Sequence, residues 1–172
     1  MENQEQLSLN SKNLLTLQDK TIMMENLLPE PGTYIIVLRI ENPVKIRIGK
    51  LGHFLFNKGY YLYTGSAHGP GGIKSRVTRH IKKKKTKRWH IDYLGSAGKI
   101  TDIFLSYSTT KIECFWAEIL DSQPYTSIPV KGFGSSDCLC ISHLFYTDKV
   151  KHLKDLKTVL QNTVEVFNAV KP

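Results

Sequence analysis

The fold of this chain is decided by three short pieces of sequence, Gly32-Thr33-Tyr34, Tyr63-Thr64-Gly65-Ser66-Ala67 and Ile73-Lys74-Ser75-Arg76-Val77-Thr78-Arg79-His80. The first two pieces begin and end apolar runs that are typical of strands. The third follows a glycine-rich turn and repeats its apolar residues every four positions, which predicts a helix from about residue 73 to 84. The stretch therefore predicts strands that deliver the chain into a basic helix.

Further strands are indicated on either side of these pieces by the pattern of apolar residues. Residues 34–40 are apolar on both faces, as in a strand buried between two layers. Residues 45–48 alternate basic and apolar, which indicates a half-exposed strand. Residues 54–56 and 60–63 flank a glycine-bearing turn, and we expect them to pair as a hairpin. A short apolar strand is expected at 103–107.

Two amphipathic helices complete the expected fold. Residues 112–120 carry apolar side chains at helical spacing, and a second stripe runs from Val150 to Phe167. We expect an α/β domain of the α+β type, in which a small, mostly antiparallel sheet is flanked by helices, with an added hairpin and a C-terminal helix. The expected divisions are a polar, partly disordered extension over 1–28, the domain over 29–147 and the C-terminal helix over 148–172.

Composition and charge narrow the classes of function. The 172 residues carry a net charge of +9, with 41% hydrophobic residues. This balance fits one soluble domain and favours a polyanionic partner such as nucleic acid, a merely soluble basic protein being the alternative. The chain has no run of about 20 apolar residues, no secretion signal at its start and an odd number of cysteines. We therefore expect no membrane contact and a cytoplasmic protein, nucleoid-associated or, in a eukaryote, nuclear.

The periodicity of the basic helix separates its charged residues. At about 100° per residue, Arg76 and His80 are neighbours on one face, whereas Arg79 points well away from them. His80 lies within the apolar stripe and Arg76 on its flank. Arg76 is therefore either a snorkelling surface arginine or a ligand for a phosphate.

A dense positive run follows this helix. It is either a solvated face or a contact surface for backbone phosphates, and beside a basic helix in a +9 chain we favour the phosphates. The residues expected to contact nucleic acid are Lys74, Arg79, Lys82, Lys83, Lys84, Lys85, Lys87 and Arg88. Next along the chain, Trp89 and Tyr93 are expected to pack, and His90 either faces the site or is a structural histidine.

The three pieces quoted first resemble, in this order, the core of the GIY-YIG nuclease superfamily, with Gly-Thr-Tyr and Tyr-Thr-Gly as the signature triplets. Trp89 to Leu94 and the run Phe133-Gly134-Ser135-Ser136-Asp137-Cys138 are similar to the Uri-type endonuclease branch. The resemblance covers about residues 31–147. It implies a divalent-metal-dependent endonuclease that hydrolyses DNA phosphodiester bonds in repair or processing of nucleic acid, with RNA not excluded.

The resemblance also implies the members of the site. Tyr34 and Tyr63 are the signature tyrosines, on adjacent strands, and Tyr34 is the candidate for accepting the proton of the attacking water. Free tyrosine has a pKa of about 10, so this role needs cationic neighbours that lower it. Arg76 would pair with the scissile phosphate, and His80 would tune Tyr34 or contact phosphate.

One Mg²⁺ or Mn²⁺ ion is the implied cofactor, held by a single glutamate. Glu113 and Glu118 both lie on the helix expected at 112–120, about 140° apart around its axis. The expected buried stripe consists of Ile112, Phe115, Trp116, Ile119 and Leu120. Glu113 falls at the edge of that stripe and Glu118 towards solvent. We therefore assign the metal to Glu113, with Glu118 as the alternative.

The chain departs from the family pattern near the site. Many members carry an asparagine after the glutamate helix, and none occurs there in this sequence. Ser135 or Asp137 is the candidate replacement. The departure motivates a first alternative function, a non-catalytic nucleic-acid-binding module of the same fold. A second alternative is an interaction module that assembles through the C-terminal helix, and the oligomeric state stays open.

A different kind of metal site is suggested by Cys138, Cys140 and His143, with Cys114 elsewhere in the chain. Thiolate and imidazole ligands suit Zn²⁺. The one-residue spacing between the two cysteines differs from the usual structural zinc pair, and buried free cysteines are common. We therefore favour free cysteines, with zinc as the alternative.

Overall fold

The computed structural model describes residues 24–169, with side-chain surroundings up to residue 162. Most of the extension predicted over 1–28 therefore lies outside the described residues. Its last part belongs to the domain, because Leu27 is buried and the amide of Leu28 donates to the Tyr107 hydroxyl at 3.0 Å. The domain thus begins slightly before the boundary expected at the prolines.

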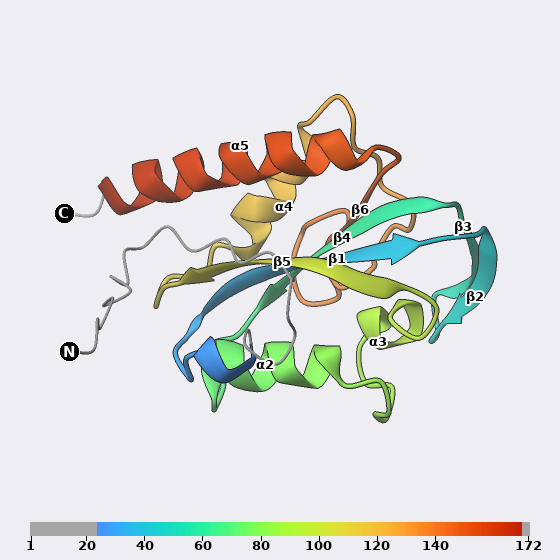
Figure 1. Cartoon of the computed structure of the whole chain (residues 1–172), viewed down its shortest axis with the longest axis horizontal. Coiled ribbons are helices and arrows are strands. Elements are labelled where there is room, and N and C mark those ends of the chain that lie inside the picture. The colour runs from blue at the N-terminus through green and yellow to red at the C-terminus, as the bar shows by residue number, and fades with distance from the viewer. Residues whose placement is uncertain (1–23, 170–172) are drawn as a thin grey trace, which may run out of the picture.

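A four-stranded antiparallel sheet forms the centre of the molecule (Figure 1). Its strand order is β5-β1-β4-β6. The bounds are β1 Gly32–Ile40, β4 Gly59–Ser66, β5 Lys99–Tyr107 and β6 Leu144–Thr147. The expected class is confirmed: a small antiparallel sheet flanked by helices.

The edge strand β6 and the short helix α3 (His90–Leu94) are elements that the sequence did not predict. Strand β6 has only four residues and follows an irregular loop, so its own pattern is too short to read. Its identity as a strand comes from pairing with β4, where Tyr60 lies opposite Thr147 and Tyr63 opposite Leu144.

The predicted hairpin between residues 54–56 and 60–63 is wrong. Strand β2 (Val44–Ile48) pairs instead with β3 (Gly52–Phe56) as a separate two-stranded sheet, while β4 pairs with β1 and β6. The turn lies at Gly49, whose φ of +47° suits glycine, and the amide of Leu51 donates to the carbonyl of Ile48. The added hairpin exists, but it lies one strand earlier than expected.

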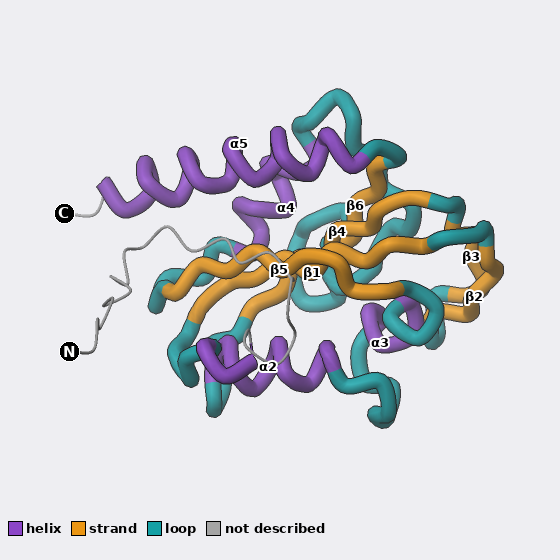
Figure 2. The backbone as a smooth tube through the Cα atoms, in the orientation of Figure 1, coloured by secondary structure: helices purple, strands orange, loops and turns teal. Residues whose placement is uncertain are grey.

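Helices cover both faces of the sheet, as the tube in Figure 2 shows. Helices α2 (Gly72–Ile81) and α3 (His90–Leu94) lie on one side, and α4 (Glu113–Asp121) and α5 (Val150–Ala169) on the other. Alternate residues of β1 enter two separate cores: Tyr34 and Ile36 face α2, whereas Ile35 and Val37 face α4 and α5. A strand buried on both faces explains the unbroken apolar run over 34–40.

The helices differ in detail from the periodic pattern. Helix α2 ends at Ile81 rather than near residue 84, because Lys82 is extended and the ammonium group of Lys85 contacts the carbonyls of Arg79 and His80. On α4, Phe115 is exposed although it was assigned to the buried stripe, and Ala117 is buried instead. Val150, counted in the stripe of α5, is also exposed.

Helix α5 packs on its own domain. Leu153, Leu156 and Leu160 are buried in the same core as Ile35 and Val37. The described part of its apolar face is therefore covered within the chain. Among the described helices, none is both long and apolar enough to cross a bilayer.

Candidate active site

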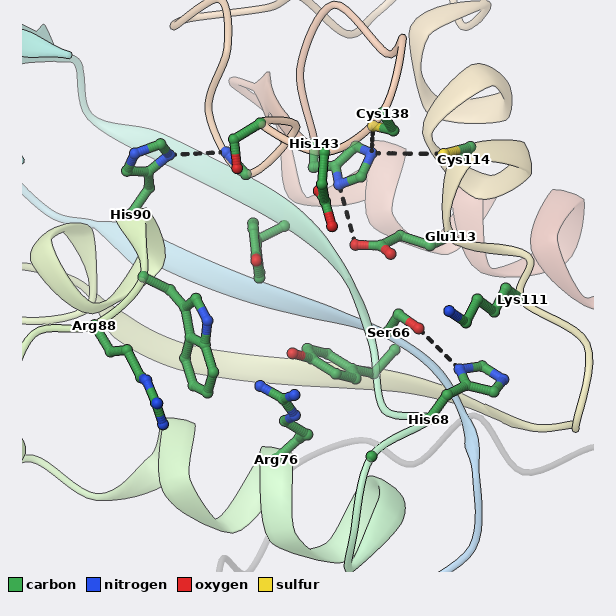
Figure 3. A pocket seen from close by; sticks show the side chains of 17 residues that line it. Ser66, His68, Arg76, Arg88, His90, Lys111, Glu113, Cys114, Cys138 and His143 are labelled. Carbon is green, nitrogen blue, oxygen red and sulfur yellow. Dashed lines mark hydrogen bonds and ion pairs between the residues drawn. The ribbon is translucent and has the colours of Figure 1, made fainter. Parts of the chain in front are cut away.

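A cleft of about 720 Å³ opens where the sheet, α2, α4 and the loop before β6 meet (Figure 3). Tyr34, Tyr63, Arg76 and Glu113 all line it, and they come from β1, β4, α2 and α4. Arg76 and Arg88 lie across the cleft from Glu113 and His143. Residues that are far apart in the sequence thus share one opening.

The pairing of β1 with β4 places the two tyrosines. Tyr34 lies opposite Gly65, and Tyr63 lies opposite Ile36, so both tyrosines project from the same face of neighbouring strands. A Cβ atom at Gly65 would collide with the Tyr34 ring. Glycine at this position therefore lets the Tyr34 ring cross over β4.

Tyr34 is hydrogen-bonded to His80, the histidine at the end of α2. The Tyr34 hydroxyl and His80 Nε2 are 2.9 Å apart. His80 Nδ1 faces the Asp92 carboxylate at 3.8 Å, too far for a hydrogen bond. Burial lowers the pKa of His80 to about 3, with Lys85 adding to the effect and Asp92 opposing it. His80 is therefore neutral near pH 7, and its Nε2 can accept a hydrogen bond from the Tyr34 hydroxyl.

The pKa values of the two tyrosines are raised, whereas the proposed role of Tyr34 as a base requires a lowered pKa. Burial raises the pKa of Tyr34 well above its usual value, Tyr63 raises it further, and Arg76 lowers it. Burial likewise raises the pKa of Tyr63. Both hydroxyls are therefore protonated near pH 7 in the protein alone, and Arg76 is the nearby cation that favours ionisation.

The two arginines of α2 have different partners. Arg76 lies in the cleft, with its guanidinium carbon 4.6 Å from the centre of the Trp89 ring. Arg79 also contacts Trp89, but both of its terminal nitrogens reach the buried Asp92 carboxylate, at 2.9 and 3.0 Å. Asp92 accepts two more hydrogen bonds, from the amides of Arg88 and Trp89.

These contacts correct part of the expected nucleic-acid surface. Arg79 is bound to Asp92, and Lys85 contacts both Asp92 and the carbonyl groups at the end of α2. We reassign both residues to the structure of this wall. The others are on the surface, and Arg88 also lines the cleft; the exposed residues are Lys74, Lys82, Lys83, Lys84, Lys87 and Arg88.

The two glutamates of α4 face different surroundings. Glu113, whose side chain is 24% exposed, lines the cleft with the tyrosines and Arg76. Glu118 is exposed and lines a separate pocket of about 430 Å³ on the other side of the helix. The geometry of α4 therefore brings Glu113, and not Glu118, to the other site residues.

Glu113 has a partner that the sequence did not predict. Nδ1 of the buried His143 lies 3.1 Å from Oε1 of Glu113, without hydrogen-bond alignment. The other ring nitrogen of His143 faces two thiols, Cys138 at 3.4 Å and Cys114 at 4.0 Å. Burial raises the pKa of Cys114 and Cys140, and the adjoining thiols raise that of Cys140 further.

The two residues proposed to replace the missing asparagine, Ser135 and Asp137, differ in burial and in their access to the cleft. Asp137 is exposed and lines the cleft. Ser135 is buried within the loop before β6, and its neighbour Ser136 lines the cleft in its place. His90 serves both expected roles, because it lines the cleft and its Nδ1 accepts a hydrogen bond from the Gly134 amide at 3.0 Å.

Ser66, His68 and Lys111 also line the cleft and were not among the predicted site residues. The hydroxyl of Ser66 and Nδ1 of His68 are 2.8 Å apart, and the opposite nitrogen, Nε2, donates to the Ser108 carbonyl at 3.1 Å. The available signal was position alone: Ser66 and His68 directly follow the second signature triplet, and Lys111 precedes the glutamate helix.

Comparison with known proteins identifies a family. A family model described as "Domain of unknown function DUF123" matches residues 33–166. The matched region includes most of α5, which the resemblance read from the sequence left out. No curated protein and no solved structure matches the chain.

Proposed function

This chain belongs to the family described as domain of unknown function DUF123, and from its own residues we propose that it is a metal-dependent endonuclease. The proposed activity is hydrolysis of DNA phosphodiester bonds by chemistry of the GIY-YIG type, in its Uri-type branch. The proposal assigns Tyr34, Tyr63, Arg76, His80 and Glu113 to the reaction.

One observation carries this proposal. Two tyrosine hydroxyls, an arginine and a carboxylate from four separate elements line a single cleft. Phosphodiester hydrolysis needs these groups together, because negative charge on the phosphoryl oxygens must be neutralised while a water is deprotonated. Pure packing would not require a guanidinium and a carboxylate on opposite walls of the same opening.

The donor set in the cleft fits one hard cation. Glu113 offers a half-buried carboxylate, and its Oε1 is turned toward His143, which leaves the second oxygen for a ligand. Mg²⁺ accepts oxygen donors and is often held by one or two carboxylates, with water and phosphate completing its shell. When bound, Mg²⁺ or Mn²⁺ would supply positive charge at the phosphate.

The protein's own groups have separate tasks in this proposal. Arg76, stacked on Trp89, would neutralise the phosphoryl oxygens with its planar set of N–H donors. Tyr34 would take the proton of the attacking water in its ionised form, which Arg76 favours, after losing its own proton to solvent; neutral His80, 2.9 Å away, accepts a hydrogen bond from the hydroxyl so formed. Asp92, facing the far nitrogen of His80, would favour the tautomer with its proton on Nδ1, which leaves Nε2 to accept from Tyr34.

Nucleic acid is the partner that suits the rim of this cleft. Arg88 lies on the lining, and Lys82, Lys83 and Lys84 are exposed next to the end of α2. Exposed cations at this position can follow the phosphate backbone without reading its sequence.

A non-catalytic nucleic-acid-binding module is the second candidate. It is favoured by the burial that keeps Tyr34 protonated and by the cleft lining, which in the described part of the chain contains no asparagine. This candidate keeps the cations and lacks turnover.

The experiment that separates them is a nicking assay on labelled duplex, branched and single-stranded DNA, with Mg²⁺, Mn²⁺ or EDTA. We expect metal-dependent cleavage that Arg76→Ala lowers about 100-fold or more, because a transition-state charge contact is lost. Arg47→Ala is the matched control, since Arg47 is exposed on the hairpin. Binding without cleavage at any metal concentration would favour the binding module.

A further inference from the structure

All three cysteines of the chain meet at one point. Cys114 lies on α4, and Cys138 and Cys140 lie on the loop before β6. With His143 they form a group whose four possible ligand atoms all lie within 4.8 Å of one another. The three thiols are free of disulfide bonds. The sequence named Cys114 beside the other three without placing it near them, and the fold brings it to them.

The separations are close to those of a tetrahedral zinc site. Zn–S and Zn–N bonds of about 2.3 and 2.0 Å place tetrahedral ligands about 3.5 to 3.8 Å apart. Nε2 of His143 lies 3.4 Å from the Cys138 sulfur and 4.0 Å from the Cys114 sulfur. The cluster therefore needs only small shifts to surround one ion.

His143 is oriented as zinc-bound histidines are. Its Nε2 points to the thiols, while its Nδ1 faces the Glu113 carboxylate at 3.1 Å (Figure 3). Histidine ligands usually present their second nitrogen to a carboxylate or carbonyl, which fixes the tautomer. This contact is independent of the thiol cluster itself and agrees with a metal on the Nε2 side.

We propose that Cys114, Cys138, Cys140 and His143 bind one Zn²⁺ ion as a structural site. Four protein ligands close the coordination shell, so the ion has no position left for substrate. Its effect is to fasten the loop before β6 onto α4. The ends of that loop are joined by backbone hydrogen bonds of Gly132 to Ile141 and of His143 to Phe133, and zinc would fix the segment between them.

A zinc site explains the group better than a disulfide does. A disulfide would use two sulfurs and leave the third cysteine and His143 without a role. Zinc uses all four donors. It also puts the remaining imidazole proton on Nδ1, toward Glu113, so the ion would hold the carboxylate of the cleft in place through His143.

The zinc proposal does not depend on the proposed cleavage. It is tested by metal analysis of the full chain, purified in the presence of EDTA and measured by inductively coupled plasma mass spectrometry. We expect about one zinc per chain, and a loss of most of it in Cys138→Ser, Cys140→Ser and His143→Gln. His152→Gln is the matched control, because His152 is also buried but contacts Thr147 outside the cluster.

Two measurements on the wild-type chain keep the test valid if a variant does not fold. A mercurial that blocks thiols should release the zinc, seen with a chromogenic chelator, and a Co²⁺-loaded chain should show thiolate-to-cobalt absorption. Glu113→Gln should retain zinc whether or not the chain cleaves DNA. Less than 0.2 zinc per chain, roughly, with three freely titrating thiols or with a disulfide, would overturn the proposal, as would iron in place of zinc.

Discussion

The two walls of the cleft hold their shapes by different means. On the wall of β1, α2 and α3, the buried residues Tyr34, His80 and Asp92 and the half-buried Arg79 form a chain of hydrogen bonds and ionic contacts. On the wall of α4 and the loop before β6, three thiols and an imidazole face one another, and the imidazole also contacts the Glu113 carboxylate.

The difference lies in how each wall is completed. On the first wall the buried carboxylate of Asp92 accepts four hydrogen bonds, so its polar atoms are satisfied within the protein. On the second wall the donors converge on a common point, which is the arrangement of a ligand set. We therefore expect the stability of the first wall to depend on the charges around Asp92, and that of the second wall to depend on the proposed zinc ion.

The largest effect on stability is expected from Arg79→Ala, which removes the main partner of a fully covered carboxylate. Breaking a buried ion pair costs about 3 kcal/mol at the lower end of the usual range, and Lys85 and two amides remain to limit the loss. Urea unfolding of both proteins measures this change. The loss should be the same in EDTA, since this wall holds no metal ligand.

Arg88→Ala is the matched control for that variant. Arg88 also lies near the Trp89 ring, at 5.8 Å, but only its backbone amide contacts Asp92. We expect a change within about 0.5 kcal/mol. Equal losses in the two variants would mean that the Asp92 ion pair does not hold this wall.

The contrast between the walls also shows what the sequence could predict. The elements of the first wall can be predicted from short local patterns in the sequence. Apolar runs identify β1 and β4, and the four-residue spacing places Arg76 and His80 on one face of α2. The partner of Arg79 was missed, because Asp92 lies 13 residues away and only the fold brings them together. The helical pattern could indicate that the Arg79 side chain points away from the cleft, but it could not identify Asp92 as its partner.

The second wall was less predictable for the same reason. Cys114 is 24 residues from Cys138 in the numbering, and its place beside the loop depends on how α4 crosses the sheet. The hairpin error had a similar origin, since the competing turns at Gly49 and Gly59 both contain glycine and strand pairing decided between them. The different exposure of Glu113 and Glu118 followed from helical spacing alone, although the same spacing wrongly placed Phe115 in the buried stripe.

Acidification is expected to lower the free energy of unfolding by about 2 kcal/mol through His80. The pKa of His80 is about 3 in the folded protein and 6.5 in the unfolded chain, so between these pH values only the unfolded chain binds a proton at His80. Stability is therefore complete above pH 6.5 and falls as the pH drops, by up to about 1.4 kcal/mol per pH unit. Asp92 stays ionised in this pH window, because its hydrogen bonds lower its pKa well below the usual value for an aspartate.

Comparison of wild type with His80→Gln isolates this contribution. Between pH 7.5 and 5, wild type should lose about 2 kcal/mol more than the variant in urea unfolding. His90, whose pKa is also lowered by burial, is present in both proteins and cancels. Identical pH dependence would mean that His80 is not held neutral by its surroundings.

The smallest effect on the fold is expected at the rim. Lys82, Lys83 and Lys84 are exposed, so replacing all three by Gln should leave stability unchanged while lowering the slope of log affinity for DNA against log salt by about one unit per contact. Lys85→Gln should lower stability and leave the salt slope unchanged, because Lys85 contacts Asp92 and the end of α2. An unchanged slope in the triple variant would return this run to a solvated face.

Glu113 connects the two walls, since its carboxylate lies in the cleft and contacts the histidine of the thiol cluster. The most direct test of the account is therefore DNA cleavage in Mn²⁺ by Glu113→Gln beside Glu118→Gln, with DNA binding and zinc content measured on the same samples. The account predicts that Glu113→Gln loses cleavage while binding and zinc persist, and that Glu118→Gln cleaves within a few-fold of wild type. Full cleavage by Glu113→Gln, or its loss only in Glu118→Gln, would contradict the assignment of the catalytic carboxylate.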